Sequence, residues 1–279
     1  MQVVIISGVS GSGKSVALNV LEDSSYYCID NLPERLLPET VQVLRDAGTE
    51  RVALAIDARS GSLALLPHHL QDLGALGVDV RVIFLDAKND TLMRRFAETR
   101  RRHPLASGQM TLEECLARER ELLGPVEEVG HKIDTSDTQP HTLRKWIREL
   151  LAVQPDTMMI LFESFGYKQG VPLDADLVFD ARCLPNPHYD PKLRPLSGLD
   201  AEIVAFLERE PEVVRMLDDV RGFLEKWLPS YARDARSYFT VALGCTGGQH
   251  RSVFFVERLA AHFRPGHCVL VRHRQLERN

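Results

Sequence analysis

The sequence predicts a two-domain α/β protein, with a P-loop (kinase-like) parallel β-sheet in the first domain and a second α/β domain after it. Three observations predict this fold. Apolar, β-branched runs alternate with stretches of helical periodicity, which is typical of parallel sheets covered by helices. Two of these runs pass directly into glycine-rich turns that open a helix. A proline-containing segment at 152–156 separates the two halves, so we expect domains at residues 1–152 and 157–279.

The composition excludes several classes of protein. The 279 residues are 44% hydrophobic and 26% charged with a net charge of −5, which is ordinary for a globular protein and not suggestive of nucleic-acid binding. No apolar run reaches about eighteen residues, so we expect no membrane span. We see no signal peptide. The five cysteines are scattered without a C-x-x-C pair, which argues against disulfides or zinc and favours a cytoplasmic location.

The first fifteen residues carry the strongest motif. Residues 3–6 are an apolar run, residues 8–15 read G-x-x-x-x-G-K-S, and residues 16–22 can continue as a helix. Strand, glycine loop and helix in this order are the context of a phosphate-binding P-loop. Its backbone N–H groups would cradle phosphate oxygens, Lys14 would reach the β- and γ-phosphates, and the Ser15 hydroxyl would bind Mg²⁺. The predicted nucleotide-binding residues of this loop are Gly8, Val9, Ser10, Gly11, Ser12, Gly13, Lys14 and Ser15.

The rest of the first domain continues the alternation. Strands are expected at 26–29, 52–56, 80–85 and 132–133, and helices at 38–46, 64–76, 91–101, 111–123 and 142–151. The helix at 111–123 begins with a Thr-x-x-Glu capping box. Four strands end at an aspartate, namely Asp30, Asp57, Asp86 and Asp134. Ligands bind at the carboxyl ends of parallel strands, so these acids would lie beside the P-loop. Asp57 and Asp86 both fit the acid that holds Mg²⁺ through water, and either could instead cap a helix.

An arginine cluster follows the third of these strands. Its members are Arg94, Arg95, Arg100, Arg101 and Arg102. They could form a lid that closes over the phosphates, or a solvated helix face. The layout, with Asp-Thr-Ser before the last helix, resembles the small P-loop kinases. A small-molecule kinase is therefore a rival prediction.

The second domain begins with strands at 158–162 and 177–179, and an amphipathic helix follows at 211–228. The proline-rich segment 186–191 is either an ordered site loop or a rigid connection. A strand from 238 then enters the glycine-rich turn 244–252, ahead of a helix at 253–263. This turn is a second anion cradle, to which Arg251 adds a bidentate donor. Cys245 and Arg251 also have the C-x5-R spacing of cysteine-dependent phosphatases. We favour phosphate binding without covalent chemistry, because no general acid can be identified.

The C-terminal residues 264–279 form a modest basic tail on an acidic chain. Its arginines are Arg264, Arg272, Arg274 and Arg278. They could contact RNA phosphates, or they could form a solvated edge.

Along essentially its whole length the chain resembles the RapZ/YvcJ family of bacterial P-loop proteins. The motifs that carry this resemblance are S-G-V-S-G-S-G-K-S at 7–15, C-I-D-N-L-P at 28–33, F-E-S-F-G at 162–166, L-P-N-P-H at 184–188, D-P-K-L-R-P at 190–195 and G-C-T-G-G-Q-H-R-S at 244–252. The P-loop alone would be unspecific, but the later motifs in this order are specific.

The resemblance implies slow hydrolysis of ATP or GTP. The family's nucleotide segments fall on residues 8–15 and on 57–60, which favours Asp57 over Asp86 as the catalytic acid beside Lys14 and Ser15. The residues of the second segment are Asp57, Ala58, Arg59 and Ser60. Some members are RNA-binding adapters that present a small regulatory RNA to an endoribonuclease and sense glucosamine-6-phosphate. RNA-binding members have a lysine-rich C-terminal end, whereas residues 272–279 here contain no lysine.

The family's sugar-phosphate pocket matches five residues of the second domain, namely Asp180, His188, Thr246, Gly247 and Arg251. We therefore expect ATP or GTP with Mg²⁺ in the first domain and a phosphorylated metabolite in the second. We also expect a homo-oligomer.

Overall fold

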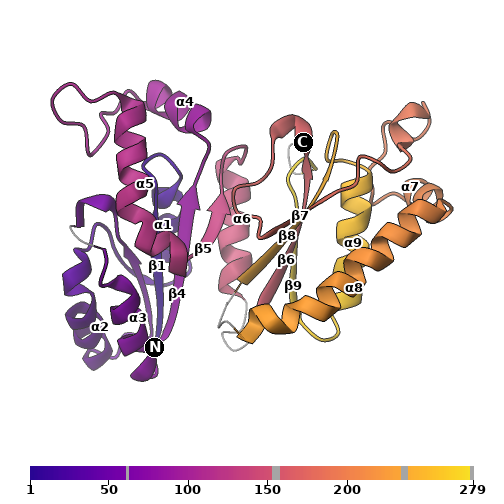
Figure 1. Cartoon of the computed structure of the whole chain (residues 1–279). Coiled ribbons are helices and arrows are strands. Elements are labelled where there is room, and N and C mark those ends of the chain that lie inside the picture. The colour runs from indigo at the N-terminus through magenta and orange to yellow at the C-terminus, as the bar shows by residue number, and fades with distance from the viewer. Residues whose placement is uncertain (61–62, 153–157, 234–237, 277–279) are drawn as a thin grey trace. The chain divides into compact units, whose positions relative to one another are not determined.

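The chain folds into two compact units, Met1–Leu151 and Ala152–Asn279. The structure is a computed structural model that describes residues 1–60, 63–152, 158–233 and 238–276. Each unit combines helices with a sheet in which every described strand pair is parallel (Figure 1). The predicted α/β fold class is therefore confirmed for both halves of the chain.

In the first unit the sheet order is β2-β3-β1-β4-β5. The strands are β1 (Gln2–Gly8), β2 (Tyr27–Ile29), β3 (Arg51–Ala55), β4 (Asp79–Asp86) and β5 (His131–Asp134). The helices are α1 (Lys14–Asp23), α2 (Leu37–Asp46), α3 (Leu66–Ala75), α4 (Asn89–Thr99), α5 (Leu112–Val129) and α6 (Pro140–Leu151), with short 3₁₀ turns η1 (Glu34–Leu36) and η2 (Ala58–Ser60). The central strand β1 is the one that runs into the glycine loop.

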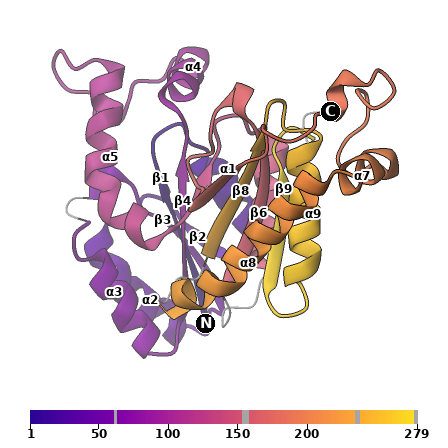
Figure 2. The ribbon, with the colours of Figure 1, turned by 45° about the vertical axis from the view of Figure 1, so that its right-hand side comes forward.

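Strand β1 is buried on both faces, as its continuous apolar run predicts. Val3 and Ile5 join a core cluster with residues of α2, α3 and α5. On the other face, α1 packs against β3 and α6. Figure 2 shows α3 and α5 lying together beside this sheet. Covering both faces leaves the strand ends as the open side of the sheet, and these ends carry the glycine loop.

The second unit has the sheet order β7-β8-β6-β9. Its strands are β6 (Met159–Gly166), β7 (Leu177–Asp180), β8 (Tyr238–Cys245) and β9 (Cys268–His273). Its helices are α7 (Ala201–Glu208), α8 (Pro211–Arg233) and α9 (Arg251–Phe263), with 3₁₀ turns η3 (Tyr167–Gln169) and η4 (Pro187–Tyr189). Helix α9 packs on β6, β8 and β9 (Figure 2).

The basic tail is where the structure departs most from the sequence-based expectation. Much of it is strand β9, which pairs with β6. Arg272 is 1% exposed and Arg274 is 7% exposed. Arg272 lies 3.8 Å from Asp174, and Arg274 lies 3.5 Å from Glu163. These two arginines therefore belong to a buried charge cluster, and both readings of them as surface groups are wrong.

Candidate functional site

The glycine loop of the first unit lies at the carboxyl end of β1. Gly8 has φ +142°, and a Cβ there would lie 2.0 Å from the carbonyl oxygen of Leu85 on the neighbouring strand. Only glycine fits this position. Val9 then donates its N–H to that same carbonyl (3.1 Å), and helix α1 begins at Lys14. The expected strand, loop and helix thus occur in order, with the loop anchored on β4.

Two side chains from elsewhere in the unit brace the loop from outside. Arg95 of α4 donates from Nη1 to the carbonyl of Gly11 (2.9 Å) and from Nη2 to the carbonyl of Thr135 (2.6 Å). Thr135 in turn donates its hydroxyl to the carbonyl of Ser12 (2.8 Å). Arg94 and Arg100 are exposed, so the members of the arginine cluster have different surroundings. Arg95 is a structural brace of the loop, and its neighbours are free to act at the surface.

Lys14 is the cation of the loop. Its ammonium donates to the carbonyl of Gly8, the first residue of the loop (2.5 Å). Burial lowers the pKa of Lys14. Three carboxylates oppose that shift, in decreasing order those of Glu119, Asp57 and Asp30. The ammonium group of Lys14 therefore lies close enough to these three carboxylates to be influenced by their charge.

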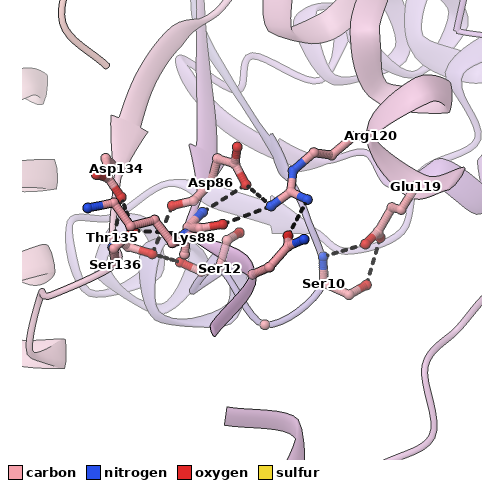
Figure 3. Close-up of polar contacts among 12 residues, drawn as sticks. Ser10, Ser12, Asp86, Lys88, Glu119, Arg120, Asp134, Thr135 and Ser136 are labelled. Carbon is pink, nitrogen blue, oxygen red and sulfur yellow. Dashed lines mark hydrogen bonds and ion pairs between the residues drawn. The ribbon is translucent and has the colours of Figure 1, made fainter. Parts of the chain in front are cut away.

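Asp57 and Asp86 have different surroundings. Asp57 accepts hydrogen bonds from the Arg59 backbone (2.9 Å) and guanidinium (2.9 Å) and contributes to the field at Lys14. Asp86 accepts instead from Arg120 (3.2 Å), as Figure 3 shows, and from the Ala87 N–H (2.8 Å). Burial raises the pKa of Asp86, against the opposing charge of Arg120. Of these two acids, Asp57 is the one whose charge acts on Lys14, whereas Asp86 is engaged by Arg120.

Ser12 and Ser15 offer hydroxyl oxygens at the loop. The Ser12 hydroxyl is buried and has no hydrogen-bond partner within the part of the chain that the structure describes. Such an unpaired buried group costs free energy unless something binds it. Ser15, in the first turn of α1, is exposed. Hydroxyl and carboxylate oxygens suit Mg²⁺, so Ser15 and Asp57 fit that ion, and the Ser12 hydroxyl fits a phosphate oxygen.

A comparable loop joins β8 to α9 in the second unit. Gly248 has φ +75°, and a Cβ there would lie 2.2 Å from Gln275 and 2.6 Å from the Gly166 nitrogen. Its N–H donates to the Cys245 sulfur (3.2 Å), and the Ser252 hydroxyl lies at the same distance from that sulfur. Burial opposes ionisation of the Cys245 thiol, but these hydrogen bonds, with the charge of Arg251, outweigh it and lower its pKa.

Arg251 begins α9 and is 3% exposed. Its Nη1 donates to the carbonyls of Arg182 (3.0 Å) and Leu184 (2.7 Å), whereas its buried Nε has no hydrogen-bond partner among the described residues. Asp180, at the end of β7, accepts from Arg182 (2.6 Å). The hydrogen bond from Arg182 lowers the pKa of Asp180, and the charge of Arg251 lowers it further. A fixed guanidinium and a carboxylate whose two oxygens both accept from Arg182 thus lie at one end of this sheet.

The other predicted residues lie around this arginine. Thr246 and Gly247 are exposed in the turn itself. His188 is exposed on η4, with its ring 6.2 Å from that of His250, which directly precedes Arg251. The five residues of the predicted pocket therefore gather at the carboxyl ends of β7 and β8. The arrangement can bind an anion through Arg251 and polar groups through Asp180.

Comparison with known protein families matches both units of the chain. Residues 1–155 match the RapZ-like N-terminal domain, and residues 158–277 match the RapZ C-terminal domain. The chain belongs to the RapZ-like family. The resemblance inferred from the motifs is confirmed.

Similar full-length proteins come from several bacteria. A protein of Aromatoleum aromaticum is 58% identical over 280 residues, which cover 100% of this chain and 96% of that protein. A protein of Methylobacillus flagellatus is 54% identical over 280 residues, with 100% of both chains covered. Both carry the name nucleotide-binding protein.

The similar solved structures are more distant from this RapZ-like chain. A sugar kinase from Janibacter is 17% identical and matches 56% of this chain and 96% of its own, with a TM-score of 0.37. A shikimate kinase from Bacteroides thetaiotaomicron is 14% identical and matches 54% of this chain and 98% of its own, with a TM-score of 0.38. The fold assigned here rests on the strand order and pairing alone. No helix in the described ranges is long and apolar enough to cross a membrane.

One acid of the RapZ-like N-terminal unit was not singled out from the sequence. Glu119 of α5 is 1% exposed and accepts from both the N–H and the hydroxyl of Ser10 in the loop (Figure 3). A signal for it was present, because Glu119 interrupts the apolar helix face formed by Leu116, Leu123 and Val126. A carboxylate on a buried face implies a polar partner across that face.

Proposed function

We propose that this RapZ-like chain binds ATP or GTP with Mg²⁺ at the glycine loop of its first unit and hydrolyses it slowly. The observation that carries this proposal is the loop itself. It starts at a Gly8 that no other residue can replace, it is held by Arg95 and Thr135, and it contains the unpaired buried hydroxyl of Ser12. Relatives over the full length of the chain are named nucleotide-binding proteins.

Each group of residues has its own role in this proposal. Backbone N–H groups of the glycine loop and of the first turn of α1 cradle the phosphate oxygens, and Lys14 exchanges its contact with the Gly8 carbonyl for the β- and γ-phosphates. Asp57, Ala58, Arg59 and Ser60 flank the nucleotide on the β3 side. Mg²⁺, held by the Ser15 hydroxyl and the Asp57 carboxylate, would neutralise phosphate charge.

We infer that the second unit binds a phosphorylated small molecule, an amino-sugar phosphate, in a regulatory role. The unpaired Nε of Arg251 supports an anion ligand, and the carboxylate edge of Asp180 supports a partner with hydroxyl or amino groups. His188, Thr246 and Gly247 complete the pocket. If this ligand regulates the nucleotide site, each ligand must change the affinity of the other by the same factor.

Calorimetric titration tests the nucleotide site. ATP and GTP with Mg²⁺ are titrated into the wild type, into Lys14→Ala, and into Lys145→Ala as a matched control on the exposed face of α6. Binding should be lost in Lys14→Ala and kept in Lys145→Ala. Equal binding by all three proteins would refute the site.

Glucosamine-6-phosphate titration tests the second site. Thr246→Ala is the better probe, because Arg251 also holds two backbone carbonyls and its removal would disturb the fold. Arg264→Ala, an exposed position after α9, is the control. Weaker binding in Thr246→Ala alone supports the pocket, and no binding to the wild type refutes it.

A small-molecule kinase is the second candidate function for the first unit. Arg95 connects the arginine-rich segment directly to the loop, which is where a lid would act. Nucleotide turnover that rises with one phosphate acceptor would favour the kinase. A role as adapter between a small regulatory RNA and an endoribonuclease would need a surface other than Arg272 and Arg274, since both are buried.

A further inference from the structure

The third residue of the glycine loop is already bound to a carboxylate. The Ser10 N–H donates to Glu119 Oε2 (2.7 Å), and the Ser10 hydroxyl donates to Glu119 Oε1 (2.7 Å). Figure 3 shows the Glu119 side chain reaching down from α5 to the loop. A carboxylate oxygen therefore accepts one of the N–H groups of a loop whose N–H groups cradle phosphate.

A buried histidine fixes this carboxylate from behind. His103 lies 3.1 Å from Glu119 Oε2 through Nε2, and its Nδ1 accepts the N–H of Leu105 (3.1 Å). Because Nδ1 is an acceptor, the proton of the neutral ring is on Nε2 and points at Glu119. The side chains of His103 and Glu119 are only 1% and 2% exposed. Water therefore has little access to this pair.

The contacts of Glu119 suit a carboxylate. The Ser10 N–H, the Ser10 hydroxyl and the His103 Nε2–H are all placed to donate to its two oxygens. The same charge acts on the loop cation, since Glu119 is the largest of the carboxylate influences that oppose the lowering of the Lys14 pKa.

We propose that Glu119 is a specificity-determining residue of the nucleotide site, whose carboxylate competes with the terminal phosphate of a nucleoside triphosphate for Ser10 and Lys14. This inference rests on the proposed nucleotide site. A diphosphate ends one phosphate earlier and meets less of this charge. The chain therefore favours nucleoside diphosphate over triphosphate, or holds them about equally, and binding of the triphosphate displaces the carboxylate.

The size of the effect follows from Coulomb's law. A unit charge about 5 Å from a phosphate, at the effective dielectric constant of about 20 typical near a protein surface, changes affinity on the order of a hundredfold. Removing the charge should therefore strengthen triphosphate binding by about tenfold or more, and change diphosphate binding by less than about threefold.

The test compares Glu119→Gln with Glu121→Gln, the same substitution at a position two residues further along α5. Glu121 is exposed and forms an ion pair with the exposed Arg118 one turn earlier on α5. ATP and ADP with Mg²⁺ are titrated calorimetrically into both variants and the wild type. The proposal expects the ratio of ATP to ADP affinity to rise about tenfold in Glu119→Gln and to stay unchanged in Glu121→Gln.

Two other results would overturn the proposal. If Glu119→Gln keeps both affinities but loses hydrolysis, Glu119 is a catalytic base. If it weakens ATP and ADP equally and lowers the melting temperature, Glu119 is only a structural clamp. Glu119→Met, which removes the charge at similar volume, repeats the test should the amide variant fold poorly.

The wild type gives a readout that needs no variant. If the wild type binds ATP more than about tenfold more tightly than ADP, that result alone contradicts the proposed competition between Glu119 and the terminal phosphate. Absence of any nucleotide binding by the wild type, or binding unaffected by Lys14→Ala, would instead refute the proposed nucleotide site. The two failures are therefore distinguishable.

Discussion

Replacing Arg274 with alanine should destabilise the second unit severely. Arg274 is 5% exposed at its side chain and lies 3.5 Å from Glu163 and 3.8 Å from Asp174, both of which are 0% exposed. Removal of one partner from a buried ion pair leaves a charge in a low dielectric and costs about 3–5 kcal/mol. For a unit of this size that corresponds to a melting-temperature drop of roughly 10–20 °C.

The assay is urea unfolding followed by tryptophan fluorescence. The chain has two tryptophans, Trp146 in α6 of the first unit and Trp227 in α8 of the second. In a Trp146→Phe background the signal reports the second unit alone. Arg264→Ala, at an exposed position, is the control and should stay within about 0.5 kcal/mol of the parent. If Arg274→Ala lowers the free energy of unfolding by less than about 1 kcal/mol, the buried charge cluster is refuted, and Arg274 behaves as a surface group.

Four further predictions concern the loops and one helix. Gly8→Ala should cost about 2–4 kcal/mol and abolish ATP binding, because its Cβ would overlap a backbone oxygen at a positive φ; unchanged thermal unfolding would contradict this. Thr111→Ala should cost about 1 kcal/mol in denaturant unfolding, since the capping box with Glu114 is formed. Ser252→Ala should raise the pKa of Cys245, seen as a later rise of thiolate absorbance than in wild type. The depressed pKa of this thiol adds stability that is full above about pH 8.5 and is lost as pH falls through the folded value, and a stability profile without this loss in wild type would contradict the shift.

The loop of the first unit could be predicted because its chemistry is local. Spacing of Gly8, Gly13 and Lys14 within one strand–turn–helix unit defines both the backbone path and the cation. The capping box at Thr111 is equally local, and it is formed as expected. Glu119 could not be assigned in the same way. Its partner Ser10 lies 109 residues away, and only the packing of α5 brings them together.

The tail shows how composition misleads when a strand is short. Arginines near a chain end were expected at the surface, as charged residues usually are. The run Cys-Val-Leu-Val at 268–271 is itself a strand signal, and pairing with β6 carries Arg272 and Arg274 into the interior. The acids that pair with these arginines, Glu163 and Asp174, lie in separate segments of the chain. A buried ion-pair cluster of this kind needs long-range contacts that no local pattern contains.

The two glycine loops share a construction but differ in how they hold their cation. Lys14 donates to the carbonyl of Gly8, a contact that its flexible side chain can exchange for a phosphate oxygen. Arg251 is fixed by two carbonyls, of Arg182 and Leu184, with its Nε left over. A cation that is already immobile loses little side-chain freedom when a ligand arrives, which under the proposed function would favour selective recognition of one small anion at the second site. The first site must rearrange its cation, and under the further inference its Glu119 as well, each time a triphosphate enters. Under the proposed function, that difference would suit a regulatory ligand in the second unit and slow hydrolysis in the first.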